Sequence, residues 1–133
     1  MAINQKVGSH ISLALSLSLV SKKNKTMTIS DLRSLTAGER FVLVDFYAEW
    51  CGPCKAMHHV LDNVQEQMAS LVDVVRVDIN RPENARLADY FRIHAVPTLI
   101  LFREGRQLWR ASGVMSQQDL INELKRQERI EVY

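Results

Sequence analysis

The stretch FVLVDFY, residues 41–47, constrains the fold more than any other part of this chain. It is apolar or aromatic at every position except Asp45. Such a continuous run is typical of a strand that is buried on both faces of a sheet, and burial on both faces requires a layer of helices on each side. The sequence therefore predicts an α/β protein, with a central mixed sheet of four to five strands flanked by helices on both faces.

The rest of the chain alternates between strand and helix patterns. Further strands are predicted at 26–30 (a short edge strand), 72–79, 97–102 and 106–111, the last two joined as a hairpin through Gly105. Helices are predicted at 30–36 with Ser30 as N-cap, from about residue 51 onward, at 82–91, and at 116–127 with Ser116 as N-cap. The long helix thus begins at the carboxyl end of a central strand, where open α/β sheets carry their sites.

Length and charge narrow the range of functions. With 133 residues the chain is long enough for one domain with a modest core. The net charge is only +2, and acidic and basic residues are interspersed, which argues against a nucleic-acid-binding protein. The two cysteines are too few for the disulfide framework of a small secreted domain.

Residues 1–26 differ in composition from the rest of the chain, and we expect them to be a disordered or weakly targeting extension of a single domain at 27–133. Their apolar run at 11–20 is shorter than the roughly 20 residues of a membrane-spanning helix. It lacks a strongly basic start and a small-residue cleavage site, so a cytoplasmic protein is expected. The run also alternates as a strand would, and two alternatives remain: export through this segment, and a functional start at Met27.

The pair Cys51 and Cys54 lies at the predicted start of the long helix. Unpaired N–H groups and the helix dipole stabilise a thiolate there, and the thiolate is the reactive form of cysteine. Pro53 suits a first turn because it has no N–H group to leave unpaired, and Gly52 keeps the approach open. This spacing suits thiol–disulfide exchange, in which Cys51 attacks a partner's disulfide and Cys54 resolves the mixed disulfide.

Two other interpretations of the cysteine pair are weaker. A structural disulfide between residues three apart closes a tiny loop and contributes little stability. A structural zinc site needs four ligands, and the residues at hand are His58 and His59. Neighbouring residues on a helix face different directions, so we expect both histidines on the surface and no metal at the site.

Asp45 is unusual because it stands inside the most apolar predicted strand. Burial disfavours the charged form of a carboxyl group, so the pKa of Asp45 is expected to be raised. A carboxylate poised near neutral pH behind the cysteines could take the proton of Cys54 during resolution. The alternative is a polar residue with satisfied hydrogen bonds at a strand end.

Three segments resemble the thioredoxin family in order and spacing: VDFYAEWCGPCK, VDINRPENARLADYFRIHAVPTLILFREG and SGVMSQQDLINEL. The resemblance covers about residues 28–127. It is specific because Trp-Cys-Gly-Pro-Cys-Lys, a strand aspartate six residues before the first cysteine, a Val-Pro-Thr and a later glycine occur together. It implies the thioredoxin fold and a protein disulfide reductase.

The resemblance also implies particular site residues. Pro97 would be in the cis form and would bring Val96 beside the two sulfurs, although by itself Pro97 could simply begin a strand. A flat apolar surface would hold an extended substrate segment along the backbone of Val96. Its residues would be Trp50, Gly52, Pro53, Ala95, Val96 and Gly113. Lys55 and Arg76 would modulate the site.

The partners implied by the resemblance are disulfide-containing proteins and an NADPH-dependent, flavin-containing thioredoxin reductase. The chain itself would carry no cofactor and no metal, and we expect a monomer without nucleic acid or stable membrane insertion. The Gly-Pro dipeptide between the cysteines resembles the reducing members of the family. Two alternatives remain: an exported thioredoxin-like oxidoreductase or disulfide isomerase, and a non-enzymatic scaffold subunit with this fold.

The chain departs from the family pattern at three positions. Tyr47 stands where the family commonly has Trp, and Arg76 stands where a Lys often neighbours the buried aspartate. His59 replaces a helix-kinking Pro, so the helix is expected to be straighter. The segment before Phe41 is also short for the usual first strand and helix. These departures bear on the reduction potential and on the range of partners.

Overall fold

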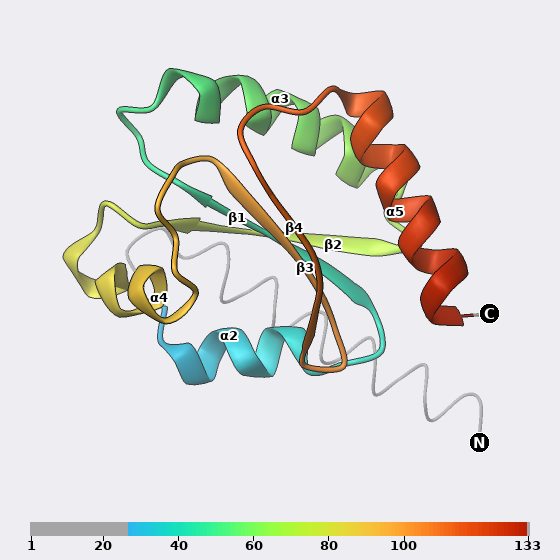
Figure 1. The fold of residues 1–133 in the computed structure, drawn as a ribbon, viewed down its shortest axis with the longest axis horizontal. Helices are drawn as coiled ribbons and strands as arrows, with labels where there is room; N and C mark the ends of the chain where they lie inside the picture. Colours follow the sequence, from blue (N-terminus) through green and yellow to red (C-terminus); the bar gives the residue numbers. More distant parts are fainter. Residues whose placement is uncertain (1–26, 133) are drawn as a thin grey trace.

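The computed structural model describes residues 27–132, which form one sheet between two layers of helices (Figure 1). In chain order the elements are α2 (Ile29–Thr36), β1 (Phe41–Tyr47), α3 (Gly52–Gln67), β2 (Val72–Asp78), the 3₁₀ turn η1 (Pro82–Asn84), α4 (Ala85–Tyr90), β3 (Thr98–Arg103), β4 (Arg106–Ser112) and α5 (Gln117–Val132). Within this range no helix is long and apolar enough to cross a membrane. The expectations about residues 1–26 lie outside the described residues.

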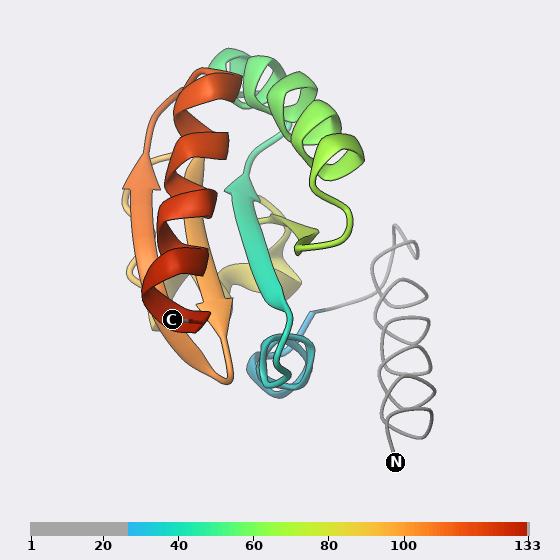
Figure 2. The same cartoon turned by 90° about the vertical axis from the view of Figure 1, so that its right-hand side faces the viewer.

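The sheet has four strands in the order β2-β1-β3-β4. β1 runs parallel to β2 and antiparallel to β3, and β3 and β4 form an antiparallel hairpin. Helices α3 and α5 cover one face, while α2 and α4 cover the other (Figure 2). The predicted α/β architecture, with a mixed sheet and helices on both faces, is therefore confirmed.

The alternation of β1 assigns its side chains to the two faces of the sheet. Phe41 and Leu43 pack with Met57 and Leu61 of α3, whereas the intervening valines and Phe46 pack with the residues of α2 and α4. Successive side chains of a strand point to opposite faces, so Asp45 falls on the face that α3 covers. The strand that carries the core thus also aims its one carboxylate at the helix that carries the cysteines.

The short edge strand predicted at 26–30 is wrong, because this segment begins α2. The Thr28 hydroxyl accepts a hydrogen bond from the Asp31 N–H, and the Asp31 carboxylate accepts one from the Thr28 N–H, each at 3.0 Å. This capping box satisfies two backbone donors at the helix start and outweighs the strand preference of threonine and isoleucine. The N-cap is therefore Thr28, and Ser30 lies within the first turn.

The ends of other elements also differ from the prediction. The helix predicted at 82–91 divides into η1 and the shorter α4, and the chain leaves α4 through Arg92 in the left-handed conformation, with φ 53°. Ser116 caps α5 as predicted, since its hydroxyl accepts the Asp119 N–H at 3.1 Å, but α5 continues to Val132. α3 is one continuous helix through His59, and its expected straightness stays a prediction.

Candidate active site

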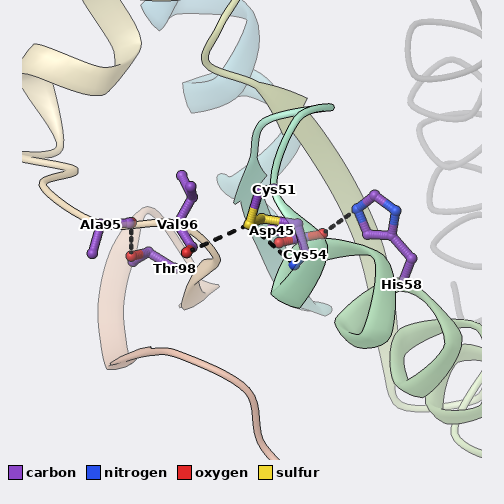
Figure 3. Close-up of a disulfide and its surroundings, with 7 residues drawn as sticks. All are labelled: Asp45, Cys51, Cys54, His58, Ala95, Val96 and Thr98. Carbon is purple, nitrogen blue, oxygen red and sulfur yellow. Dashed lines mark hydrogen bonds and ion pairs between the residues drawn. A yellow bond between two sulfur atoms is a disulfide. The ribbon is translucent and has the colours of Figure 1, made fainter.

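The two cysteines lie at the junction between β1 and α3, and in this structure they form a disulfide (Figure 3). Cys51 is the N-cap of α3, and its Sγ accepts a hydrogen bond from the Cys54 backbone N–H at 3.1 Å. The Cα atoms are 5.3 Å apart, and Cys51 and Cys54 are 4% and 1% exposed. The first helical turn thus holds both sulfurs together and leaves Gly52 and Pro53 at the surface.

A second segment approaches the sulfurs from the start of β3. The Val96–Pro97 peptide bond is cis, as expected, and the Val96 carbonyl oxygen lies 3.7 Å from the Cys51 Sγ. The Pro97 carbonyl accepts the Gly113 N–H at 2.9 Å, which attaches this segment to the end of β4. Gly113 has φ 94°, a backbone conformation that side-chain-bearing residues rarely adopt. The expectation that Val96 lies beside the sulfurs is confirmed.

Around Cys51 the predicted substrate-binding residues are mostly at the surface. Trp50 is 71% exposed, and Val96 is half-buried against the cysteines. The Thr98 hydroxyl donates to the Ala95 carbonyl at 2.6 Å and so fixes the backbone that leads to Val96 (Figure 3). The exposed members of the set are Trp50, Gly52, Pro53, Ala95 and Gly113. Their role in substrate binding stays a prediction, as does a modulating role for the exposed Lys55.

Asp45 is completely buried, and neither carboxylate oxygen has a hydrogen-bond partner among residues 27–132. Burial raises its pKa from 3.8 to about 7, and the positive charge of Arg76 opposes part of that rise. Arg76 lies directly opposite Asp45 in the parallel register of β1 and β2. The predicted rise in the pKa of Asp45 is therefore confirmed, while its catalytic role remains to be proposed.

His58 is a site residue that the sequence analysis missed. Its Nε2 lies 3.2 Å from the Asp45 Oδ2, close enough for an ion pair although not aligned as a hydrogen bond (Figure 3). The Tyr47 ring packs edge-on against the imidazole, with centroids 4.7 Å apart. The expectation that both histidines lie on the surface is confirmed for His59, which is exposed, whereas His58 is only partly exposed and its Nε2 is buried. The available signal was spacing, because His58 follows Cys54 by four residues and shares its helix face.

Arg76 connects β2 to the same part of α3. Its guanidinium donates to the His58 carbonyl oxygen at 3.2 Å and to the Asp62 carboxylate at 2.5 Å. Burial and the Arg76 charge lower the pKa of His58 below 6.5, which favours a neutral ring. Within the described part of the chain, no three His, Cys, Asp or Glu side chains are grouped so as to hold a metal ion.

The family model of the thioredoxins matches residues 23–126. The chain belongs to the thioredoxin family. A thioredoxin from Mycobacterium tuberculosis is 36% identical over 108 residues, which cover 78% of this chain and 90% of that protein. The chloroplastic Thioredoxin Y of Oryza sativa is 35% identical over 106 residues, 80% of this chain but 61% of the rice protein, so the chain spans about three fifths of that relative.

Solved structures agree with this assignment. A mutant thioredoxin from Halobacterium salinarum superposes with a TM-score of 0.68 at 32% identity, over 76% of this chain and 86% of that one. The sheet and its helical layers are therefore the thioredoxin fold. With Cys51 and Cys54 joined at the start of α3, the pair supports the dithiol–disulfide redox function of the family, and the chain is a thiol–disulfide oxidoreductase.

Proposed function

We propose that this thioredoxin is a protein disulfide reductase in which Cys51 attacks the substrate. The observation that carries the proposal is the position of the Cys51 Sγ as N-cap of α3, where the Cys54 N–H points at it. In the reduced protein the same N–H donor and the helix dipole stabilise a Cys51 thiolate. The thiolate attacks one sulfur of a substrate disulfide, forms a mixed disulfide and releases the other substrate sulfur as a thiolate.

Resolution of the mixed disulfide needs a deprotonated Cys54. Asp45 lies on the face of β1 that α3 covers, is buried, and has a pKa of about 7, so its carboxylate can accept a proton near neutral pH. In the proposed step the Cys54 S–H bond breaks, its proton goes to Asp45, and the Cys54 sulfur attacks the Cys51 Sγ. The Cys51–Cys54 bond forms, and the second substrate sulfur leaves as a thiolate.

Substrate binding is proposed at the apolar surface around Cys51. The Val96 backbone lies beside the reactive sulfur, so an extended substrate segment can pair with it as an added strand. Trp50, with most of its ring exposed, flanks the same approach. The set proposed for this surface is Trp50, Gly52, Pro53, Ala95, Val96 and Gly113.

The proposed partners are disulfide-containing proteins, and an NADPH-dependent thioredoxin reductase restores the dithiol. We place the protein in the cytoplasm as a monomer, with export through residues 1–26 as the alternative. The family assignment supports disulfide-containing proteins as partners, while the relatives, which include a mycobacterial and a chloroplastic thioredoxin, favour no single location.

The reduction potential of the Cys51–Cys54 pair tests whether the protein reduces substrate disulfides, as proposed, or forms them. The full chain is equilibrated with glutathione buffers, and tryptophan fluorescence, with Trp50 next to Cys51, reports the oxidised fraction. We expect a value near or below about −250 mV, which suits a cytosolic reductase. A value above about −200 mV would assign the protein to oxidants or isomerases and would favour export. A Cys51→Ser, Cys54→Ser double variant that keeps the cellular function would instead support a scaffold.

A further inference from the structure

The Asp45 carboxyl group is deeply enclosed, yet the proposed reaction requires it to gain and lose a proton in every turnover. Its side chain has no exposed surface, and no hydrogen bond from residues 27–132 links it to the outside. A proton delivered by Cys54 therefore needs a group that reaches both the carboxyl oxygen and the surface. Among residues 27–132, His58 has its Nε2 beside the Asp45 Oδ2 (Figure 3) and a side chain that is partly exposed.

The two ends of the His58 imidazole lie in different surroundings. Nε2 is buried and 3.2 Å from the Asp45 Oδ2, while the side chain as a whole is 25% exposed. The exposed part of the side chain thus lies on atoms other than Nε2. Terminal torsions such as that of the imidazole ring are broad, so a small rotation can align Nε2 with Oδ2. The helix places this ring one turn after Cys54, on the same face.

We propose that His58 is a positioning residue that carries the proton between Asp45 and solvent. This inference rests on the proposed role of Asp45 as proton acceptor. After resolution the Asp45 Oδ2–H bond breaks, and an Nε2–H bond forms on the neutral imidazole. Asp45 is again a carboxylate, and rotation of the imidazolium about its side-chain torsions brings Nε2 to water, where the Nε2–H bond breaks, the proton leaves and the neutral ring keeps its Nδ1–H tautomer. No electrons are transferred in these steps.

The charged and titratable groups around His58 come from three elements. Those that face it are Asp45 and Tyr47 on β1, Arg76 on β2, and Asp62 and His59 on α3. Arg76 lies against the helix backbone at His58 and, with burial, favours the neutral ring that can accept a proton. Asp62 forms an ion pair with Arg76, and this limits how far the negative charge of Asp62 raises the pKa of His58.

The experiment follows resolution by stopped-flow tryptophan fluorescence when the reduced full chain meets an excess of a disulfide peptide. The variants are His58→Ala, which leaves room for an added base, and His58→Gln, which keeps the size of the side chain. His59→Gln is the matched control, because His59 is the exposed neighbour on the same helix. Each protein is measured from pH 6 to 8 in weak buffer, with and without added imidazole.

We expect both His58 variants to resolve about tenfold more slowly in weak buffer, since a positioned acid–base group contributes about 100-fold or more and water replaces part of it. Added imidazole should restore His58→Ala, while the wild type and His59→Gln should not respond. Resolution of the His58 variants at the wild-type rate, or a loss in His58→Ala that imidazole does not restore, would overturn the relay. A loss in His58→Ala that imidazole does not restore would indicate that His58 has a structural role instead.

Asp45→Asn separates this inference from the proposed function. If Asp45→Asn resolves at the wild-type rate, the role of Asp45 itself fails, and the relay fails with it. If Asp45→Asn is slow while His58→Ala and His58→Gln are unimpaired, Asp45 remains the acceptor and the relay alone is wrong. The relay also requires that the double variant Asp45→Asn, His58→Gln be no slower than Asp45→Asn.

Discussion

The backbone N–H of Cys54 donates a hydrogen bond to the Cys51 Sγ across 3.1 Å, so one of the two sulfurs is itself the N-cap of the helix that carries the other. The relationship is asymmetric, because Cys54 lies inside the first turn and its sulfur caps nothing. Cys51 and Cys54 should therefore differ in reactivity although they share one turn of helix.

In the reduced protein, Cys51 should be alkylated by iodoacetamide at pH 7 at least about tenfold faster than Cys54, because a hydrogen bond to a charged group is worth about 1.5–3 kcal/mol. Peptide mass spectrometry after short exposures measures both rates. Cys54→Ser should keep the fast rate, and Cys51→Ser should lose it. Preferential alkylation of Cys54 would contradict the assignment of the nucleophile.

Asp45→Asn should stabilise the oxidised protein at alkaline pH. The native pKa of about 7 lies above the ordinary 3.8, so the native state holds a proton that the unfolded state has lost between about pH 4 and 7. Stability should fall as pH rises through this window, by up to about 4 kcal/mol. The Asn variant lacks this penalty, and its advantage should be present at pH 8 and nearly absent at pH 4.

Guanidinium unfolding at pH 4 and pH 8 measures how Asp45→Asn changes the free energy of unfolding. Asp89→Asn, which neutralises an exposed carboxylate, is the control and should show little difference between the two. An Asp45→Asn advantage that is the same at pH 4 and pH 8 would show that ionisation of Asp45 is not its source.

Arg76→Gln should raise the pKa of Asp45, because the Arg76 charge lowers it in the native protein. The pKa of His58 should rise as well, since the same charge lowers it. Carbon-13 NMR titration of the carboxyl group and of the imidazole follows both. Arg76→Lys retains the charge and should stay closer to the wild type. A lower titration midpoint for Asp45 in Arg76→Gln would refute the electrostatic coupling across β1 and β2.

Glu104→Asn should stabilise the fold by about 0.5–1 kcal/mol. Glu104 and Gly105 form the two-residue turn between β3 and β4, with φ 53° and 76°. Positive φ at both positions favours Asn-Gly, and the 3.4 Å ion pair of the exposed Glu104 with the half-buried Arg103 contributes little. Denaturant midpoints measure the gain. Glu104→Gln removes the same charge without easing the backbone, so equal midpoints for the two variants would exclude the turn as the cause.

Much of the fold could be predicted because the apolar pattern of each segment matches the surface that the segment buries in the folded protein. The run 41–47 is apolar on both sides because α3 and α2 cover its two faces, and the apolar spacing of α3 and α5 matches the residues that pack on the sheet. The prediction for 26–30 is wrong because residue preference alone ignores the Thr28–Asp31 capping box. Helix ends at 82–91 depend on a 3₁₀ turn that periodicity does not reveal.

Within the site, contacts between residues close in the sequence are easier to predict than contacts between residues that only folding brings together. The placement of Cys51 and Cys54 follows from one strand-to-helix junction, and the buried state of Asp45 follows from its apolar neighbours. The approach of Val96 comes only from the family resemblance. His58 escapes sequence analysis because its partner Asp45 lies in a different element, and no local pattern shows which helix residue faces which strand residue.

The interior position of β3 determines when the proposed substrate surface becomes complete during synthesis of the chain. Val96 lies 45 residues after Cys51, and β3 occupies its place between β1 and β4 only when the hairpin has been made. A growing chain that ends before Val96 carries both cysteines, Trp50, Gly52 and Pro53, but lacks the Val96 backbone that lies 3.7 Å from the Cys51 Sγ. The substrate surface proposed around Cys51 is therefore incomplete until the last third of the polypeptide has joined the sheet.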